Sequence, residues 1–188
     1  MLIERFHNFQ PQDFIFKIAR TDEDLEGFFA LRRRIFCEEQ AVFESDDRDL
    51  TDENMLPIVC KPLIAGMEDN VIGVVRIDER EPGIWYGSRL GVAPEFRRVR
   101  RLSPGVAARN HQPCYAGLGA IGASLIYKAV STANAIGCHE FLATVQHQNA
   151  KFFTRLHWQS LKEIEIHGLK HIKMRADLDH YLPAKMVA

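Results

Sequence analysis

The sequence predicts one α+β domain, a mixed α/β arrangement with a mostly antiparallel twisted sheet and helices on both faces. Three observations support this class. The 188 residues suit one domain and are enough to bury a substantial core. The 46% hydrophobic and 26% charged residues are typical of a globular protein and exclude a disordered or collagen-like chain. Strand and helix patterns follow one another in the order β-α-β-β-β-α-β-α-β-β, without an internal repeat.

The first half of the chain predicts one helix and four strands. Thr21 and Asp24 form a capping pair, and apolar residues recur behind them at helical spacing, so we expect a helix over 22–37. An acidic loop with a short helix follows. Runs rich in apolar and β-branched residues, bounded by turns, predict strands over 13–19, 57–65, 71–77 and 84–92.

The second half begins with an irregular stretch and then the clearest helix of the chain. Its apolar stripe spans 120–136, and Gly137 ends it. A short apolar strand over 141–145, a short helix over 149–156 and a closing hairpin of 162–166 and 170–177 follow. The strands on either side of the long helix form a βαβ unit, so 84–92 and 141–145 should run parallel.

Composition excludes several functional classes. The net charge of −1 gives no whole-chain case for nucleic-acid or membrane binding. No apolar run reaches the length of about 20 residues that a membrane span needs, and the first residues lack the pattern of a signal peptide. The four cysteines form no C-x-x-C pair, so we expect no metal site. Reduced thiols favour a cytoplasmic location.

Charge is distributed unevenly along the chain. Residues 38–54, hereafter the acidic segment, hold eight carboxylates and only Arg48 as a cation. Residues 89–109 hold six arginines and only Glu95 as an acid. Two interpretations stay open: two solvated loops, or a cationic acceptor near the first segment and a phosphorylated ligand near the second.

A glycine pattern opens the long helix. Residues 117–122 read Gly-Leu-Gly-Ala-Ile-Gly and match G-x-G-x-x-G, whose backbone N–H groups at a helix start can hold a diphosphate. NAD binding requires a strand directly before the loop and an acid after the next strand. The chain has neither, because Gln146 follows the strand. A glycine-rich helix start without a ligand is the plain alternative, and another diphosphate ligand fits better.

That ligand is indicated by a family resemblance. Residues 89–98 read Arg-Leu-Gly-Val-Ala-Pro-Glu-Phe-Arg-Arg and resemble the GNAT N-acetyltransferase superfamily, whose glycine loop holds the pyrophosphate of coenzyme A. The family pattern resumes at Gly119, so we interpret 100–118 as a nineteen-residue insertion and expect it to cover the ligand. Residues 146–158 resemble the family's segment after the next strand. More closely, the chain resembles acetyltransferases of bacterial and cyanobacterial nitrogen-starvation gene clusters.

The resemblance implies a single GNAT domain over 1–188 that uses acetyl-CoA and no metal. Two departures concern Phe153, where many members have the tyrosine that protonates the leaving thiolate, and His157, where glycine is usual. The coenzyme A residues that the resemblance implies are Leu90, Gly91, Val92, Arg97, Arg98, Gly117, Gly119, Ala120, Ile121, Gly122, Ala123, Asn149, Phe152 and Phe153.

A partial resemblance to acyl-homoserine-lactone synthases concerns the acceptor. These enzymes share the fold, and their pocket pattern matches Asp46-x-x-Asp49 together with the acceptor-binding candidates Arg32, Phe36, Arg76 and Arg89. Val42 stands near the place of their tryptophan, and Tyr86 replaces their strand glutamate. Structural ion pairs among the same residues are the alternative.

The expected reaction is transfer of an acetyl group from acetyl-CoA to an amine of a small molecule, by direct attack in a ternary complex. The amine must lose a proton before attack. Candidates for the base are Glu39, Asp46, Asp49 and Asp78, and Tyr86 is the alternative hydroxyl for the leaving thiolate. Two other functions stay open: a non-catalytic acyl-CoA-binding module, and a signal synthase of the lactone type. A homodimer is compatible with the fold.

Overall fold

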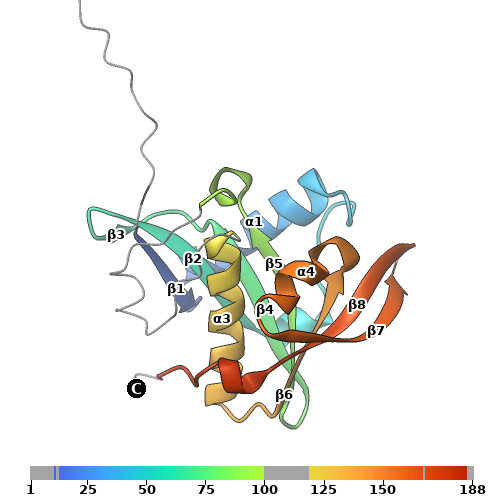
Figure 1. Cartoon of the computed structure of the whole chain (residues 1–188). Helices are drawn as coiled ribbons and strands as arrows, with labels where there is room; N and C mark the ends of the chain where they lie inside the picture. The colour runs from blue at the N-terminus through green and yellow to red at the C-terminus, as the bar shows by residue number, and fades with distance from the viewer. Residues whose placement is uncertain (1–10, 12, 100–118, 167, 186–188) are drawn as a thin grey trace, which may run out of the picture.

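The computed structural model describes residues 11, 13–99, 119–166 and 168–185. It contains one eight-stranded mixed sheet, which confirms the predicted α+β class (Figure 1). The strand order is β1-β2-β4-β5-β6-β8-β7, with β3 paired to β2. The strands are β1 (Asp13–Ile18), β2 (Leu56–Ile64), β3 (Met67–Glu68), β4 (Gly73–Glu81), β5 (Ile84–Val92), β6 (Glu140–Gln146), β7 (Trp158–Ile166) and β8 (Leu169–Ala176).

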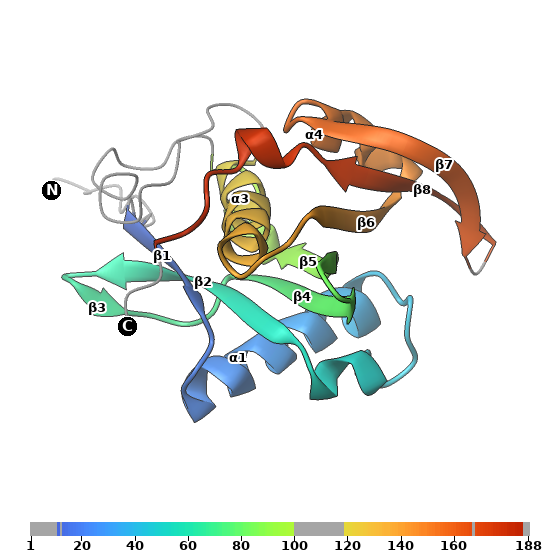
Figure 2. The same ribbon diagram turned by 90° about the horizontal axis from the view of Figure 1, so that it is seen from below.

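Every strand pair is antiparallel except β5–β6, which is parallel as the βαβ unit predicts. Helices lie on both faces of the sheet, with α1 (Asp22–Arg33) on one face and α3 (Ala120–Ala135) on the other (Figure 2). A short helix, α4 (Ala150–Thr154), follows β6. The described residues also form short 3₁₀ helices: η2 (Leu50–Glu53), η3 (Pro94–Phe96), η4 (His147–Asn149) and η5 (Leu178–His180).

The predicted helix over 22–37 differs from the structure at its C-terminal end, because the α-helix ends at Arg33. After Arg33 the chain continues as a π-helical segment, η1 (Arg34–Glu39), in which the Gln40 N–H reaches back five residues to the Ile35 carbonyl. This wider turn packs directly on β5, because a Cβ placed on Gly91 would lie 2.7 Å from Cδ1 of Ile35. Gly91 therefore allows η1 to approach the sheet.

Strand boundaries also differ from those expected. The turn glutamate-aspartate-asparagine at 68–70 was expected to join the strands 57–65 and 71–77, but the chain turns earlier, at Ala65–Gly66, where both residues have positive φ, and Met67–Glu68 returns as β3. Accordingly β4 begins at Gly73 instead of 71. β7 begins at Trp158 instead of 162, because Trp158 pairs with Ala176 and its side chain is buried. The predicted insertion over 100–118, its covering role and Gly117 lie outside the described residues.

The core lies mainly between the sheet and α3, and includes Phe14 and Phe16 of β1 and Ile121 and Leu125 of α3. Each of these side chains is almost completely buried. Among the helices of the described ranges, none combines the length and apolar character required to cross a bilayer.

Candidate active site

The central feature of the site is an opening between β5 and β6. The two strands pair from Ile84 with Glu140 to Gly87 with Ala143, and the pairing ends there. Both strands continue, β5 to Val92 and β6 to Gln146, without pairing to each other. Backbone groups on the facing edges are therefore available to a ligand.

A β-bulge shapes β5 at the start of this gap. Arg76 pairs with Ser88 and Val74 with Gly91, so the single residue Val75 lies opposite both Arg89 and Leu90. Arg89 has φ of +54°, in the left-handed region that favours glycine. Such a bulge bends its strand, here just beyond Gly87, the last residue of β5 that pairs with β6.

The backbone of Val92 faces the gap. The N–H of the next residue, Ala93, donates to the Ile72 carbonyl at 2.8 Å, on the β4 side. Because successive residues of a strand direct their backbone groups to opposite sides, the Val92 N–H and C=O point away from β4. The Val92 carbonyl accepts a hydrogen bond from Arg97 Nε at 2.8 Å.

A cavity of about 530 Å³ occupies this opening. It extends from α3, where Ile126 contributes to the wall, to the β7–β8 hairpin, where His171 contributes. Predicted site residues that line it are Phe36, Asp49, Tyr86, Arg89, Leu90, Asn149 and Phe153.

The start of α3 lies at one end of the opening. Gly119 has φ of +68° and precedes the helix without a side-chain cap. The Ala120 N–H donates to the Val99 carbonyl at 3.1 Å, whereas no described residue accepts from Ile121 or Gly122. A Cβ on Gly122 would lie 3.8 Å from Cζ of Phe152 and 3.9 Å from Cγ2 of Val92. The N–H groups of this first turn therefore lie beside the end of β5 and α4.

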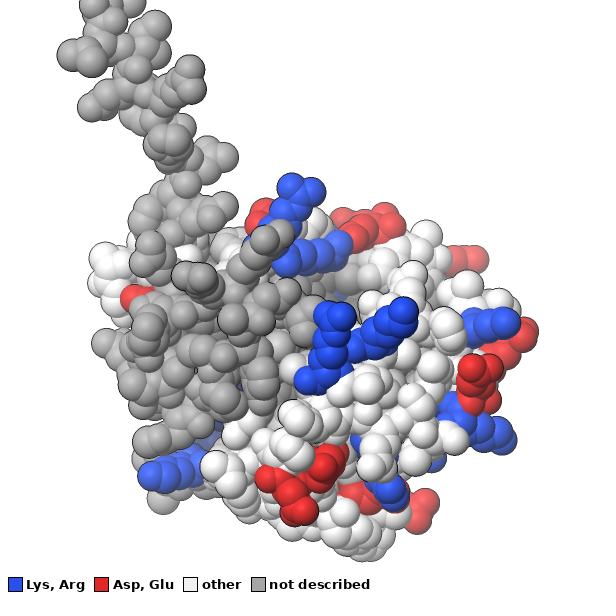
Figure 3. All heavy atoms as spheres, viewed as in Figure 1, with Lys and Arg blue, Asp and Glu red and all other residues white. Residues whose placement is uncertain are grey.

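Positive side chains accompany this helix start. Arg97 and Arg98 follow η3, Lys151 lies on α4, Arg155 follows it, and all four are exposed. Lys and Arg side chains gather on this face, over α4 and near η3 (Figure 3). Ala123 is buried and contributes to packing of the first turn. The N–H groups of the first turn, the helix dipole and the exposed cations together suit a diphosphate.

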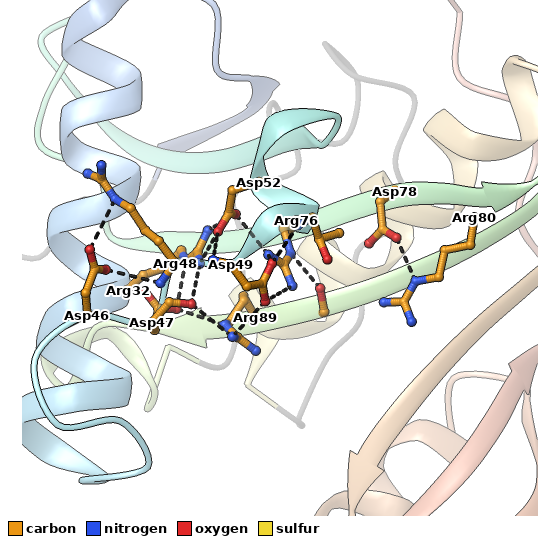
Figure 4. Close-up of polar contacts among 12 residues, drawn as sticks. Arg32, Asp46, Asp47, Arg48, Asp49, Asp52, Arg76, Asp78, Arg80 and Arg89 are labelled. Carbon is orange, nitrogen blue, oxygen red and sulfur yellow. Dashed lines mark hydrogen bonds and ion pairs between the residues drawn. The ribbon is translucent and has the colours of Figure 1, made fainter.

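The acidic segment is held to the sheet by ion pairs. Figure 4 shows side chains from α1, β4 and β5 converging on it. We call these contacts the arginine–aspartate network. Its members are Arg32, Arg76, Arg89, Asp47, Asp49 and Asp52.

Each arginine of the network contacts two aspartates. Arg32 reaches Asp47 at 2.8 Å and Asp52 at 2.5 Å. Arg76 forms two hydrogen bonds with Asp49, at 2.6 and 3.1 Å, and also contacts Asp52 at 3.0 Å. Arg89 reaches Asp47 at 2.9 Å and Asp49 at 3.2 Å. The three positive and three negative charges balance, so the network itself offers little net charge to a cationic acceptor.

Burial makes the network rigid. The Arg32 side chain is 0% exposed and that of Asp47 is 1% exposed. Desolvation alone would raise the pKa of Asp52, but hydrogen bonds from Arg32 and Asp49 lower it to about 2. The pKa of Asp49 is also lowered, because its contacts with Arg76 outweigh its desolvation. The Asp49 and Asp52 carboxylates are therefore ionised, and both form ion pairs with arginines.

The structure separates the predicted acceptor residues into two groups. Phe36, Asp49 and Arg89 line the cavity, whereas Arg32 and Arg76 are buried behind it. Their position assigns Arg32 and Arg76 to support of the wall instead of contact with a ligand.

Asp46 lies outside both the cavity and the network. It is exposed and faces Arg48 at 3.8 Å. The predicted spacing Asp46-x-x-Asp49 recurs three residues later as Asp49-x-x-Asp52. This second pair of carboxylates forms the ion pairs with the arginines. Sequence reasoning missed Asp47 and Asp52 because a continuous acidic run does not indicate which carboxylates point inward.

The other candidate bases also have arginine partners. Both carboxylate oxygens of Glu39 accept from Arg97, at 2.5 and 2.7 Å, and these hydrogen bonds lower the pKa of Glu39. Asp78 is buried and contacts Nε of Arg80 at 2.8 Å.

Tyr86 is placed between two cations on the cavity wall. The Arg80 guanidinium lies 4.1 Å from the ring centroid, and Lys173 Nζ donates to the hydroxyl at 3.2 Å. Phe153 is buried in edge contact with Trp158, so it fills space and has no hydroxyl. His157 keeps a positive φ of +62°, the conformation that glycine would favour at this position.

His171 is among the cavity residues that the sequence analysis did not single out. His171 on β8 lines the cavity, and its Nδ1 lies 2.8 Å from the Leu169 carbonyl. Alternation in the predicted hairpin places it on one face with Lys173, but the sequence does not show that this face meets β5. Among the described residues, no cluster of three or more His, Cys, Asp or Glu could hold a metal ion.

Comparison with known proteins identifies the fold. No protein-family profile matches the chain, and no curated protein matches it in sequence. Solved structures match over most of its length. An acyl-CoA N-acyltransferase from Pseudomonas aeruginosa superposes with a TM-score of 0.60 and 16% identity, over 87% of this chain and 99% of that chain. Escherichia coli ElaA gives 0.62 and 15%, over 88% and 99%.

A CoA-dependent acyl-homoserine lactone synthase, BjaI, gives a TM-score of 0.59 and 17% identity, over 82% of this chain and 75% of that chain. Its structure holds SAM and isopentyl-CoA. The chain therefore has the GNAT fold, as the sequence resemblance implies. At these identities the likeness establishes the fold, and the chemistry must be argued from the site.

Proposed function

We propose that the protein is an acyl-CoA-dependent N-acyltransferase that transfers acetyl from acetyl-CoA to an amine of a small molecule. The observation that carries this proposal is the cavity of about 530 Å³ between the diverging ends of β5 and β6. Its wall is polar and aromatic, and the start of α3 lies beside Val92 at the end of β5, so a ligand along the open edge of β5 could reach both parts of a bisubstrate site.

The residues divide naturally between two ligands. Leu90, Gly91, Val92 and Asn149 are proposed to hold the pantetheine arm, with the Val92 backbone as its hydrogen-bonding partner. The Val92 N–H, or a neighbouring one, would also stabilise the thioester oxygen during attack. The diphosphate is assigned to Gly119, Ala120, Ile121, Gly122, Arg97 and Arg98, and Phe152 packs beside it.

The acceptor is assigned to the opposite end of the cavity, against Phe36, Asp49 and Arg89. Direct attack in a ternary complex fits a single continuous cavity, because no covalent carrier is needed. The Tyr86 hydroxyl, held by Lys173, is the proposed proton source for the leaving thiolate. The network behind this wall fixes its shape.

A lactone-type signal synthase is the second candidate, favoured by the arginine–aspartate network. It would take longer acyl donors.

We further propose that the protein is a cytoplasmic acetyltransferase related to those of nitrogen-starvation gene clusters. We also propose that it forms a homodimer, and native mass spectrometry of the purified protein tests this assembly.

Thiol release tests the proposal. Acetyl-CoA is offered with an amino acid, a polyamine, an arylalkylamine and an amino sugar, and mass spectrometry identifies the acylated product. Release of one thiol per amide formed supports the transferase. Calorimetric binding of acetyl-CoA without release, for every amine, would favour a binding module. Release only with longer acyl-CoAs and S-adenosylmethionine would favour the synthase.

A further inference from the structure

The reaction needs a base with an available lone pair, because an ammonium ion cannot attack a thioester. The carboxylates near the site are poor candidates. Glu39, Asp49 and Asp78 each hold an arginine, and Asp46 lies outside the cavity. A carboxylate that already pairs with a guanidinium accepts a further proton less readily.

His171 is different. It is the one histidine among the described residues that lines the cavity. Its Nδ1 lies 2.8 Å from the Leu169 carbonyl oxygen, which can only accept a hydrogen bond. Nδ1 must therefore carry the proton, and in the neutral ring Nε2 has a free lone pair.

Register places His171 at the right level of the site. It pairs with Gln146 of β6, three residues beyond Ala143, where β5 and β6 part. Opposite residues of an antiparallel pair share a face, so Gln146 and His171 both flank the open part of the sheet. Leu90, at the bulge of β5, lines the same cavity.

We propose that His171 is the general base that deprotonates the acceptor amine. This inference rests on the proposed function. Nε2 takes a proton from the ammonium form of the acceptor and becomes part of an imidazolium. The nitrogen lone pair then forms the C–N bond at the thioester carbon, and the C–S bond breaks with its electron pair on sulfur. The second nitrogen proton ends on the thiolate, and His171 returns the first to solvent.

Other charged groups near His171 set the controls. Lys162 and Lys173 share its face of the hairpin by register, and Arg80, Arg89 and Asp49 line the same cavity. η4 packs against β8 and carries His147, which is exposed. Of these groups, only His147 is of a type that ordinarily titrates between about pH 5 and 8. His147→Asn is therefore the matched control.

His171→Asn is the test variant, because its amide can still donate to the Leu169 carbonyl but supplies no base. With the amine that the thiol-release panel selects, we expect kcat to fall by about 100-fold or more. Acetyl-CoA affinity and Tm should stay near wild type. The wild-type rate should level off once the imidazole is neutral, whereas the variant rate should keep rising with pH as solvent deprotonates the amine. His147→Asn should keep the wild-type profile.

A measurement on the free protein tests the geometry without turnover. Nitrogen-15 NMR of the imidazole, assigned with His171→Asn, should show a neutral ring protonated at Nδ1. A ring protonated at Nε2 overturns the proposal. If the wild type acylates an amine and His171→Asn does so with the same rate and pH profile, the role of His171 is overturned and the proposed function stands. A wild-type protein that acylates none of the amines overturns the proposed function, and with it this role.

Discussion

Asp47 and Asp46 are neighbours in the chain, and the structure predicts opposite consequences for them. The Asp47 carboxylate accepts from Nε of Arg32 at 2.8 Å and from Nε of Arg89 at 2.9 Å, and it is 1% exposed. Asp47→Asn removes the charge and leaves the buried Arg32 guanidinium and the partly buried Arg89 guanidinium with a weaker partner. Breaking a buried ion pair on one side costs about 3–5 kcal/mol.

For a chain of 188 residues this cost corresponds to a fall in Tm of about 6–20 °C. Asp46→Asn is the matched control. Its carboxylate is exposed and 3.8 Å from Arg48, so the free energy of unfolding should change by less than about 0.5 kcal/mol. Urea unfolding followed by circular dichroism measures both variants. Equal stability of the two, or a larger loss for Asp46→Asn, would refute the assignment of the network.

The other predictions concern the ligand ends of the cavity and acid stability. Gly122→Glu should weaken acetyl-CoA binding by more than about tenfold in calorimetry, because a carboxylate enters the diphosphate cradle; Gly122→Ala, whose Cβ has ordinary contacts at 3.8 Å, should bind nearly as wild type. Asp49→Asn should raise the acceptor KM by about tenfold while the Kd for acetyl-CoA is kept, and equal loss of both with a lower Tm would favour a purely structural role. Asp52 has a folded-state pKa of about 2, below the ordinary aspartate value of 3.8, so the stability it contributes is complete above pH 3.8 and is lost as the pH falls toward 2. The loss should be about 2 kcal/mol in acid unfolding curves and should be absent from Asp52→Asn.

Periodicity and connection rules were sufficient to predict seven of the eight strands and the one parallel pair, but not β3. The βαβ unit required parallel β5 and β6, and the structure has that pair. The bulge on β5 was not predictable in the same way. A left-handed residue in a bulge is commonly glycine, but here Arg89 adopts φ of +54°. Contacts of its guanidinium with Asp47 and Asp49 hold this conformation, and those contacts come from a distant segment.

The candidate site shows the same division. The glycine loop and Val92 follow from local patterns, since a helix start and a strand end can be placed from sequence. The inward face of the acidic segment cannot, because an irregular segment has no period that separates Asp46 from Asp47. His171 is a third kind of case. Strand alternation predicts which face of the β7–β8 hairpin carries His171. Its place in the cavity depends on how β8 pairs with the end of β6 that has separated from β5.

The central claim is that acyl-CoA binds in the gap between β5 and β6, with its pantetheine arm on the backbone of Val92. Amide hydrogen exchange measured by NMR tests this most directly, because the neighbouring amide of Ala93 is an internal control. Ala93 already donates to the Ile72 carbonyl, whereas the Val92 amide faces the gap. Saturating acetyl-CoA should slow exchange at Val92 by about tenfold or more and leave Ala93 unchanged. Unchanged exchange at Val92 in protein that calorimetry shows to be saturated with acetyl-CoA would contradict the account.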